Sequence, residues 1–191
     1  IEHGDTMNVV AFRTKRDGVW DDAEWVKPMD RAAMEHDFDG WVDPVRQILK
    51  LMQKPDIWAL FHHRPGALSY CKNRVCLLGD AAHASTPHNG AGAGMAIEDA
   101  LCMSRLLARV YDSKDLPRAF VAFDRVRRPR TQRHVEDSYI TGQLYDFHEA
   151  GVDADIPKVQ ERLATKMDWY WHYDLDAEAT EAQRVYEEEA N

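Results

Sequence analysis

The sequence predicts an α/β fold, which within these 191 residues takes an α+β arrangement of a few strands and many helices. Two observations favour it. An uninterrupted apolar run at residues 75–78 has the composition of a strand covered on both faces. A glycine-rich stretch follows this run and leads into long segments of helical periodicity, the first of which begins near Gly94. The loop between strand and helix is therefore the place to look for a ligand site.

The start of this loop has residues that suit a ligand. Gly79 allows the backbone to turn sharply where the apolar run ends. Asp80 follows at the carboxyl end of the strand. A carboxylate has only acceptor lone pairs, so it is suited to receive hydrogen bonds from the hydroxyls of a sugar or a sugar alcohol. Ala81 and Ala82 leave room for such a ligand.

The second half of the loop has little side-chain cover. Gly90, Gly92 and Gly94 alternate with Ala91 and Ala93, so a flat ligand can come close to main-chain N–H groups. The run leads into the first turn of a helix, whose N–H groups lack partners and whose dipole places about half a positive charge there. An anion, or a ring that becomes anionic, is favoured at such a place. The alternative is a tight connection whose glycines serve packing only.

Local patterns predict the other elements. Strands are expected near residues 7–14, 24–27, 57–63 and 74–78. Asp30 can cap one helix, and Asp43 with Pro44 in the first turn predicts another that runs to about residue 52. Pro117 stands in the first turn of a long helix that can bend at Pro129. Further helices are expected near residues 156–170 and 176–189.

Two side-chain patterns on these helices invite interpretation. The helix from about residue 94 to residue 110 carries a stripe that we expect to pack on the sheet, made of Ile97, Ala100, Leu101, Ser104, Leu107 and Ala108. A group of arginines at helical spacing is more typical of a solvated face, or of partners for neighbouring acids, than of a phosphate site: Arg125, Arg127, Arg128, Arg130 and Arg133.

Composition narrows the function. The net charge of −9 disfavours nucleic acid as a partner, and no apolar run approaches the roughly 20 residues that cross a bilayer. No signal-peptide pattern opens the chain. Cys71, Cys76 and Cys102 lie in apolar surroundings, which suits reduced thiols in the cytoplasm. No metal is expected, because His83 and His88 have no third ligand at convincing spacing.

The strand–loop–helix segment resembles the second FAD motif of the class A flavoprotein aromatic hydroxylases, and most of all the salicylate hydroxylase branch. The resemblance rests on Gly79-Asp80-Ala81-Ala82-His83, Pro87, Gly90-Ala91-Gly92-Ala93-Gly94 and Glu98-Asp99. It implies that Asp80 contacts the ribityl chain of FAD and that the backbone of the glycine run meets the pyrimidine side of the isoalloxazine. Pro87 would lie beside the ring where oxygen reacts. The implied FAD-binding residues are Gly79, Asp80, Pro87, Gly90, Ala91, Gly92, Ala93 and Gly94.

By the same resemblance, the chain corresponds to the C-terminal half of a longer two-domain enzyme. We find neither the Gly-x-Gly-x-x-Gly turn that holds the ADP pyrophosphate in that family nor its middle Asp-Gly motif. The missing N-terminal half is therefore expected as a partner. We expect residues 1–73 to belong to the substrate-binding domain, residues 74–110 to carry the second FAD motif, and residues 111–191 to form a C-terminal helical region.

The strand that holds His62 and Arg64 borders the substrate cavity in the resembled family. Either side chain could orient a phenol or a carboxylate, and an ordinary polar strand end is the alternative. His83 is expected to make structural hydrogen bonds, and Tyr139 and Tyr145 are expected to be packing residues. No catalytic residue is assigned.

The resemblance implies an FAD-dependent monooxygenase that hydroxylates a phenolic or aromatic acid substrate with O2 and NADH or NADPH, through a C4a-hydroperoxyflavin. This chain is then expected to be inactive by itself. Two alternatives stay open. One is a flavin monooxygenase of other chemistry, such as epoxidation or Baeyer–Villiger oxidation, and the other is a non-catalytic truncated paralogue that binds a partner subunit. The protein is expected in the cytoplasm, where it could form a homodimer.

Overall fold

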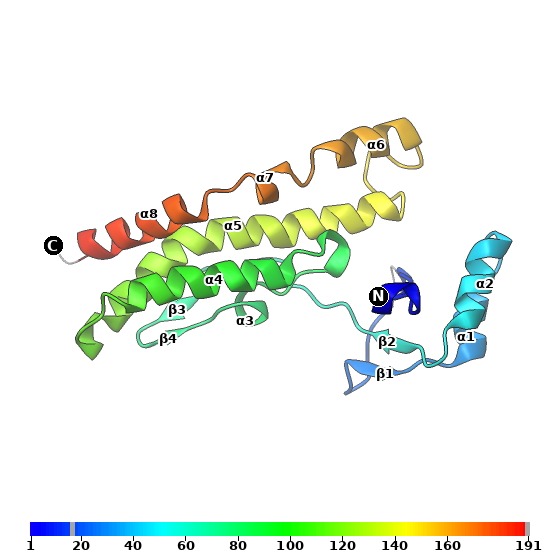
Figure 1. Cartoon of the computed structure of the whole chain (residues 1–191), viewed down its shortest axis with the longest axis horizontal. Helices are drawn as coiled ribbons and strands as arrows, with labels where there is room; N and C mark the ends of the chain where they lie inside the picture. The colour runs from blue at the N-terminus through cyan, green and yellow to red at the C-terminus, as the bar shows by residue number, and fades with distance from the viewer. Residues whose placement is uncertain (16–17, 190–191) are drawn as a thin grey trace. The chain divides into compact units, whose positions relative to one another are not determined.

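The computed structural model describes residues 1–15 and 18–189 (Figure 1). Contacts between residues divide the chain into two compact units, Ile1–Ala59 and Leu60–Asn191. Each unit combines helices with one two-stranded sheet, so the predicted mixed fold is confirmed. The predicted division into three segments at residues 73 and 110 follows the expected functions of the segments rather than contacts, and it stays a prediction.

The first unit is a small antiparallel sheet with two helices. Its elements are η1 (Glu2–Gly4), β1 (Val26–Pro28), α1 (Arg31–Asp37), α2 (Asp43–Leu51) and β2 (Asp56–Trp58). In the sheet, Val26 pairs with Trp58 and Lys27 with Ile57. The carboxylate of Asp30 accepts a hydrogen bond of 2.8 Å from the N–H of Ala33, which confirms the predicted cap of α1. Buried apolar side chains of this unit form a small core of Met34, Phe38 and Leu49.

The predicted strand at residues 7–14 is wrong, because none of these residues belongs to a strand. A strand needs a hydrogen-bonded neighbour, and in the described part of the first unit β1 and β2 pair with each other alone. The strand expected at 57–63 ends at Trp58. Beyond it the N–H of Ala59 bonds to the carbonyl oxygen of Trp25 and that of His63 to the carbonyl oxygen of Ala84, both at 2.9 Å, so the residues that follow bond to different segments and do not extend one strand. The strand expected at residues 74–78 comprises only Val75–Cys76. Since Val75 is 64% exposed and Leu77 39% exposed, the described residues do not cover this run on both faces.

The second unit begins with a hairpin and continues as helices. The hairpin pairs β3 (Cys71–Lys72) with β4 (Val75–Cys76) in antiparallel register. Next come α3 (Asp80–His83), η2 (Pro87–Asn89), α4 (Gly92–Leu107) and η3 (Ser113–Asp115). The last elements are α5 (Leu116–Tyr145), α6 (Ile156–Ala164), α7 (Asp168–Trp171) and α8 (Leu175–Glu188).

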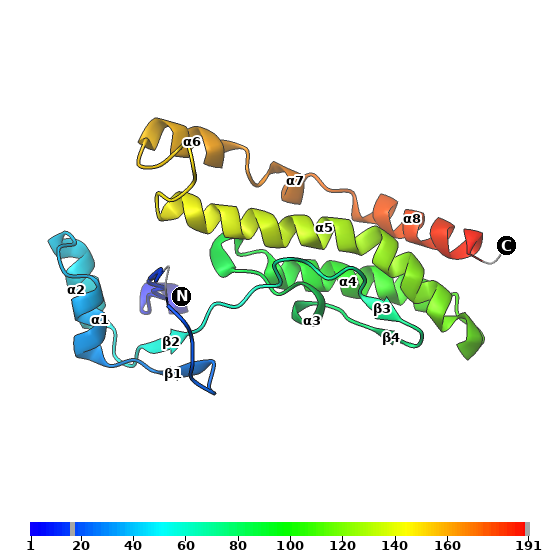
Figure 2. The same ribbon diagram turned by 180° about the vertical axis from the view of Figure 1, so that it is seen from behind.

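Three helices, α4, α5 and α8, pack side by side and form the main core (Figures 1 and 2). The hairpin and α3 lie against α5. The core is made of Tyr70, Ala82, Cys102, Met103, Leu106, Ala119, Ala122, Phe123, Ala182, Val185 and Tyr186. None of the helices in the described residues combines the length and the apolarity that a membrane span requires.

The predicted packing stripe of α4 is wrong. Ile97 is 70% exposed and Leu107 41% exposed. The buried face of this helix instead consists of Met95, Asp99, Cys102, Met103 and Leu106. The prediction failed because it assumed that charged side chains of this helix face solvent. The carboxylate of Asp99 is instead fully buried and is hydrogen-bonded to three groups, which are described with the site below.

The long helix α5 has Pro117 in its first turn, as predicted. It continues through Pro129, and Figure 2 shows the helix axis changing direction between its two halves, as proline favours. The single helix predicted at 156–170 is instead two, α6 and α7. The second of them contacts α5 through Arg130 and the carbonyl oxygen of Trp169 and through His134 and Tyr170, pairings between distant residues that local sequence does not reveal. The last predicted helix, at 176–189, is confirmed as α8.

Candidate functional site

The turn at Gly79 is built as the sequence predicts. Gly79 has a φ of +56°, in the left-handed region, and an added Cβ would lie 3.3 Å from the Cβ of Ala96 in α4. Both the conformation and the close approach therefore favour glycine. Asp80 follows as the first residue of α3, and its side chain is exposed. The turn thus presents an exposed carboxylate directly after the residue that packs on Ala96 of α4.

The first turn of α4 is backbone with little cover. Ala91 precedes the helix and provides no side-chain hydrogen bond to its N–H groups. An added Cβ at Gly94 would meet no atom within 4 Å, and Ala93 and Gly94 are exposed. Gly90, before the helix, has a φ of +60°. Uncapped N–H groups at an open helix N-terminus are able to receive an anion or a polarised ring.

The loop between α3 and α4, which carries Pro87, is fixed to α5 by hydrogen bonds. The hydroxyl of Ser138 donates to the carbonyl oxygen of Thr86 and accepts from the Thr86 hydroxyl at 3.2 Å. The N–H of Asn89 also reaches the Ser138 hydroxyl, at 3.4 Å. The oxygen of Ser85 lies 2.8 Å from Nε2 of His134. These contacts hold the loop without involving the glycine run itself.

Asp99 fixes the Gly79 turn to the helices. Its carboxylate accepts from the N–H of Gly79 at 2.9 Å and from Nε of Arg127 at 2.8 Å, and lies 2.7 Å from Nε2 of His83. Burial by itself would raise the pKa of Asp99, but these hydrogen bonds outweigh burial and hold the pKa below its ordinary value. The expected structural hydrogen bond of His83 is therefore present.

Arg127 is completely buried and compensates several acids. Its guanidinium donates to Glu98 at 2.8 Å and to Glu178 at 2.7 Å, in addition to Asp99. Arg130 donates from two nitrogens to the two oxygens of Glu98, both at 2.8 Å. For these two arginines the solvated face is the wrong interpretation, and pairing with neighbouring acids is confirmed. The network joins α4, α5 and α8 beneath the FAD-like motif.

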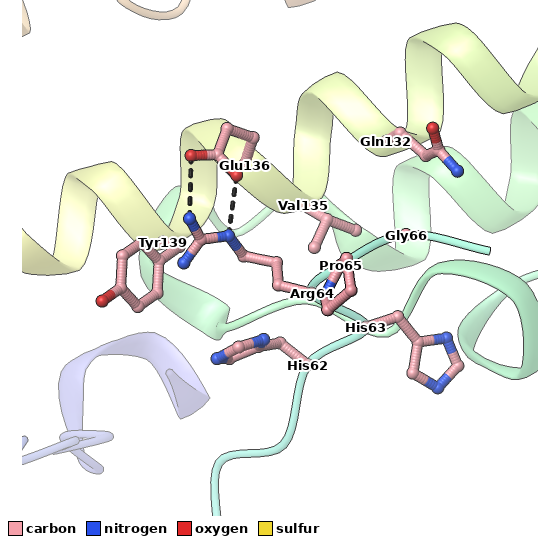
Figure 3. A pocket seen from close by; sticks show the side chains of 9 residues that line it. All are labelled: His62, His63, Arg64, Pro65, Gly66, Gln132, Val135, Glu136 and Tyr139. Atoms are coloured by element: carbon pink, nitrogen blue, oxygen red, sulfur yellow. Dashed lines mark hydrogen bonds and ion pairs between the residues drawn. The ribbon is translucent and has the colours of Figure 1, made fainter. Parts of the chain in front are cut away.

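A cavity of about 580 Å³ lies where the segment after residue 60 meets α5 (Figure 3). It is lined by His62, His63, Arg64, Pro65, Gly66, Gln132, Val135, Glu136 and Tyr139. The structure thus brings the two predicted pocket residues together. Sequence reasoning missed the helical side of the cavity, although the positions three and four apart on α5 (Gln132, Val135, Glu136 and Tyr139) mark one helix face.

Arg64 is held by two partners in this cavity. Its Nε and Nη2 donate to the two carboxylate oxygens of Glu136, at 2.7 and 3.0 Å. Its guanidinium carbon lies 3.7 Å from the ring centroid of Tyr139, which Figure 3 shows at the same end of the cavity. A carboxylate ligand would therefore have to compete with Glu136 for this arginine. Tyr139 does pack, as predicted, whereas Tyr145 is 51% exposed and meets only the ring of His88 at 6.4 Å among the ring contacts of the described residues.

His62 keeps an unused polar atom at the cavity. Its ring lies 5.5 Å from that of Tyr139, edge to face, and its Nδ1 is buried without a hydrogen-bond partner among the described residues. Burial, followed by the charge of Arg64, lowers the pKa of His62, so the ring is neutral at pH 7. Figure 3 shows His63 pointing away from it. Within the described residues no group of three potential metal ligands occurs.

A second cavity of about 430 Å³ connects this region to α3. It shares residues 62–65 with the first cavity and adds Ala67, Leu77, Ala81 and Ala82. Ala81, which is exposed, therefore borders open space, whereas Ala82 is 2% exposed and belongs mainly to the core. Asp80 and the glycine run line neither of the two cavities described for this part of the chain.

Comparisons with known proteins agree on one family. Residues 48–138 match a family described as an FAD binding domain. The chain is 39% identical over 97% of its length to the 6-methylsalicylate 1-monooxygenase atA of Aspergillus terreus, and covers 41% of that protein. It is 40% identical over 96% of its length to a salicylate hydroxylase of Pseudomonas putida, and covers 43% of it. The chain thus spans about two fifths of the length of the curated relatives it matches.

Solved structures give the same result. A salicylate hydroxylase in a substrate complex superposes with a TM-score of 0.81 at 38% identity, covering 91% of this chain and 42% of that one. Klebsiella pneumoniae HpxO, complexed with FAD and uric acid, superposes with a TM-score of 0.56 at 20% identity, which shows the fold alone. The chain therefore belongs to the family of FAD-dependent monooxygenases that includes the salicylate hydroxylases.

Proposed function

We propose that this chain provides part of the FAD site and of the substrate pocket of a monooxygenase that hydroxylates a phenolic or aromatic acid substrate with O2 and NADH or NADPH. The observation that carries the proposal is the uncapped, open first turn of α4, together with the exposed carboxylate of Asp80 after a Gly79 turn that packs on Ala96 of the same helix. The names of the relatives, which act on salicylate or 6-methylsalicylate, support an aromatic hydroxy acid as substrate.

The residues present fit FAD. Asp80 is free to accept hydrogen bonds from the ribityl hydroxyls, because its side chain is exposed. The N–H of Gly90 is used within the loop, where it donates to the carbonyl oxygen of Pro87 at 3.0 Å. Residues 91–94 provide the start of α4 with only glycine and alanine, so little side chain blocks a flat ring, and the helix dipole favours negative charge on that ring. Gly79 shapes the turn, and Pro87 lies on the loop fixed to α5. When bound, FAD accepts a hydride and activates oxygen, while the protein orients the substrate and excludes water.

His62 and Arg64 are proposed to serve the substrate differently. His62 is neutral and has an unpartnered Nδ1, so it can bond the hydroxyl of a phenol. Arg64 is already paired with Glu136 and stacked on Tyr139, so we assign it to shaping the cavity and to the local positive potential. The cavity's volume of about 580 Å³ is in the range of small-molecule sites.

Three further parts of the proposal concern the whole protein. The uncovered helix start implies a partner segment that holds the rest of FAD, as an N-terminal half would. The cysteines are free, and burial raises the pKa of Cys76 and Cys102 to about 12, which suits reduced thiols in the cytoplasm. A homodimer is also proposed, to be tested by sedimentation.

The test joins this chain to the part of the Pseudomonas putida salicylate hydroxylase that it does not match, and we call the product the fused protein. We expect yellow, FAD-bound protein that oxidises NADH in the presence of salicylate and forms a hydroxylated product by mass spectrometry. The chain alone is the control and is expected to be inactive. A folded fused protein that binds no flavin would contradict the proposal. NADH oxidation that yields only hydrogen peroxide would contradict the substrate class.

A further inference from the structure

A chain of four hydrogen-bonded side chains runs beneath the loop that carries Pro87. The amide nitrogen of Asn89 lies 2.9 Å from the hydroxyl of Tyr170, and this hydroxyl lies 2.8 Å from Nδ1 of His134. Nε2 of His134 in turn lies 2.8 Å from the hydroxyl of Ser85. This series of hydrogen bonds starts and ends on the loop and passes through Tyr170 of α7 and His134 of α5.

The chemistry of the partners fixes the direction of this chain. The side-chain nitrogen of Asn89 can only donate, so the oxygen of Tyr170 accepts from it and its own proton is left for Nδ1 of His134. Burial, above all, lowers the pKa of His134 to about 4, so the ring is neutral at pH 7. Its one proton is therefore on Nε2 and is donated to Ser85. Ser85 keeps its own proton free to donate.

Ser85, the last member of this series of hydrogen bonds, lies beside the glycine run. The oxygen of Ser85 lies 3.5 Å from the position that a Cβ on Gly92 would occupy. Tyr170 stacks on Trp169 of the same helix, with ring centroids 3.9 Å apart, and the guanidinium of Arg133 in α5 lies 4.2 Å from the ring of Trp169, so α7 is held on α5. The ring of His134 meets Tyr170 edge to face at 5.7 Å. An anchored α7 therefore determines where both ends of the loop lie.

We propose that Tyr170 and His134 are positioning residues of the flavin site, which fix the loop of Pro87 and the Ser85 hydroxyl through this directional chain. The inference rests on the proposed function. It assigns a role to α7, which lies far along the sequence from the FAD-like motif and contributes no residue to it. Neither residue is proposed to touch the flavin.

The experiment compares Tyr170→Phe with Tyr111→Phe. Tyr170→Phe removes one oxygen and keeps the ring, whereas Tyr111 is 95% exposed and serves as the control. In the fused protein we expect Tyr170→Phe to raise the dissociation constant of FAD by about tenfold, as the loss of a buried hydrogen-bond partner does. In the chain alone, without flavin, we expect faster amide hydrogen exchange in residues 84–91 only. The control should change neither value.

A second pair of variants separates hydrogen bonding from packing. Gln at position 134 retains a donor and an acceptor, so His134→Gln is expected to bind FAD more tightly than His134→Leu. A role in packing alone would not favour Gln over Leu. Ser85→Ala interrupts the other end, so its effect on FAD binding should not add to that of Tyr170→Phe. Should Tyr170→Phe fail to fold, Ser85→Ala must still weaken FAD binding for the inference to stand.

Each result of these experiments either supports or contradicts the inference. Wild-type FAD affinity in Tyr170→Phe or Ser85→Ala would overturn the inference, even if hydrogen exchange in the loop increased. If the fused protein with the wild-type chain binds no FAD, the proposed function fails instead. The two failures are therefore distinguishable.

Discussion

Single side chains decide how the Gly79 turn is held. Asp99 lies inside the protein because Arg127, His83 and the N–H of Gly79 all bond its carboxylate. Sequence reasoning found Gly79 and Asp80, since a glycine that follows an apolar run and precedes an acid has a local meaning. It could not place Asp99, because a buried carboxylate depends on partners that lie far along the chain.

The first prediction concerns Arg127. Arg127→Met leaves Glu98, Asp99 and Glu178 without their shared cation, so the free energy of unfolding should fall by about 3–5 kcal/mol. Urea unfolding followed by circular dichroism measures it. The matched control is Arg125→Met on the same helix, whose exposed pair with Glu189 should be worth less than about 1 kcal/mol. Equal losses in both variants would contradict the role given to Arg127.

The second prediction concerns Asp80. Asp80→Ala should weaken FAD binding to the fused protein by about 1.5–3 kcal/mol, the range for hydrogen bonds to a charged group. Stability should change little, because the side chain is exposed. Asp43→Ala is the control, since Asp43 is likewise an exposed carboxylate at the first position of a helix. Isothermal titration with FAD is the measurement, and an unchanged affinity would remove Asp80 from the site.

At the scale of elements, the start of α4 is where structure and function make opposite demands. Glycine in a helix lowers stability, and at Gly94 the fold itself leaves open space where a side chain would be. The protein therefore gains nothing in packing from glycine there. Under the proposed function, glycine stands at position 94 because the bound ligand needs the space that a side chain would occupy.

The third prediction follows from this conflict. Gly94→Ala should stabilise the chain by about 0.5–1 kcal/mol, because alanine is the better helix former. The same change should weaken FAD binding, because the methyl group occupies the space of the flat ring. Thermal unfolding of the chain alone and FAD titration of the fused protein give the two values. If Gly94→Ala binds FAD as the wild type does, the glycine run does not face the flavin.

At the scale of the whole molecule, stability should depend on pH through His134, which joins α5 to α7 and to the loop before η2. Burial lowers its pKa to about 4 from the ordinary value of 6.5. Between about pH 6.5 and pH 4, His134 therefore binds a proton in the unfolded chain but stays neutral in the folded chain. The free energy of unfolding contributed by this residue is complete above pH 6.5 and is lost as the pH falls towards 4.

The fourth prediction is that lowering the pH from 7 to 5 costs the wild-type chain about 2 kcal/mol of stability through this residue. His134→Gln should lose less over the same interval. His62 and His88, whose pKa values burial also lowers, act in the same direction in both proteins, so the difference isolates His134. Urea unfolding at pH 7, 6 and 5 provides the comparison. Parallel curves for the two proteins would refute the assignment of a neutral His134.

The sequence by itself determined the features that depend on neighbouring residues. These are the turn at Gly79, the cap at Asp30, the helix starts at Asp43 and Pro117, and the glycine run at the start of α4. Backbone conformation and capping act within a few residues, so their signals are local.

Only the tertiary structure decided what long-range pairing controls. It showed that residues 7–14 lack a strand partner, that α4 buries Asp99 rather than Ile97, and that Arg127 is enclosed by acids. It also brought Glu136 and Tyr139 of α5 to Arg64, and Tyr170 of α7 to the loop of Pro87. The physical reason is that a buried charge or a strand is stable only with a partner, and the sequence does not say which distant residue that partner will be.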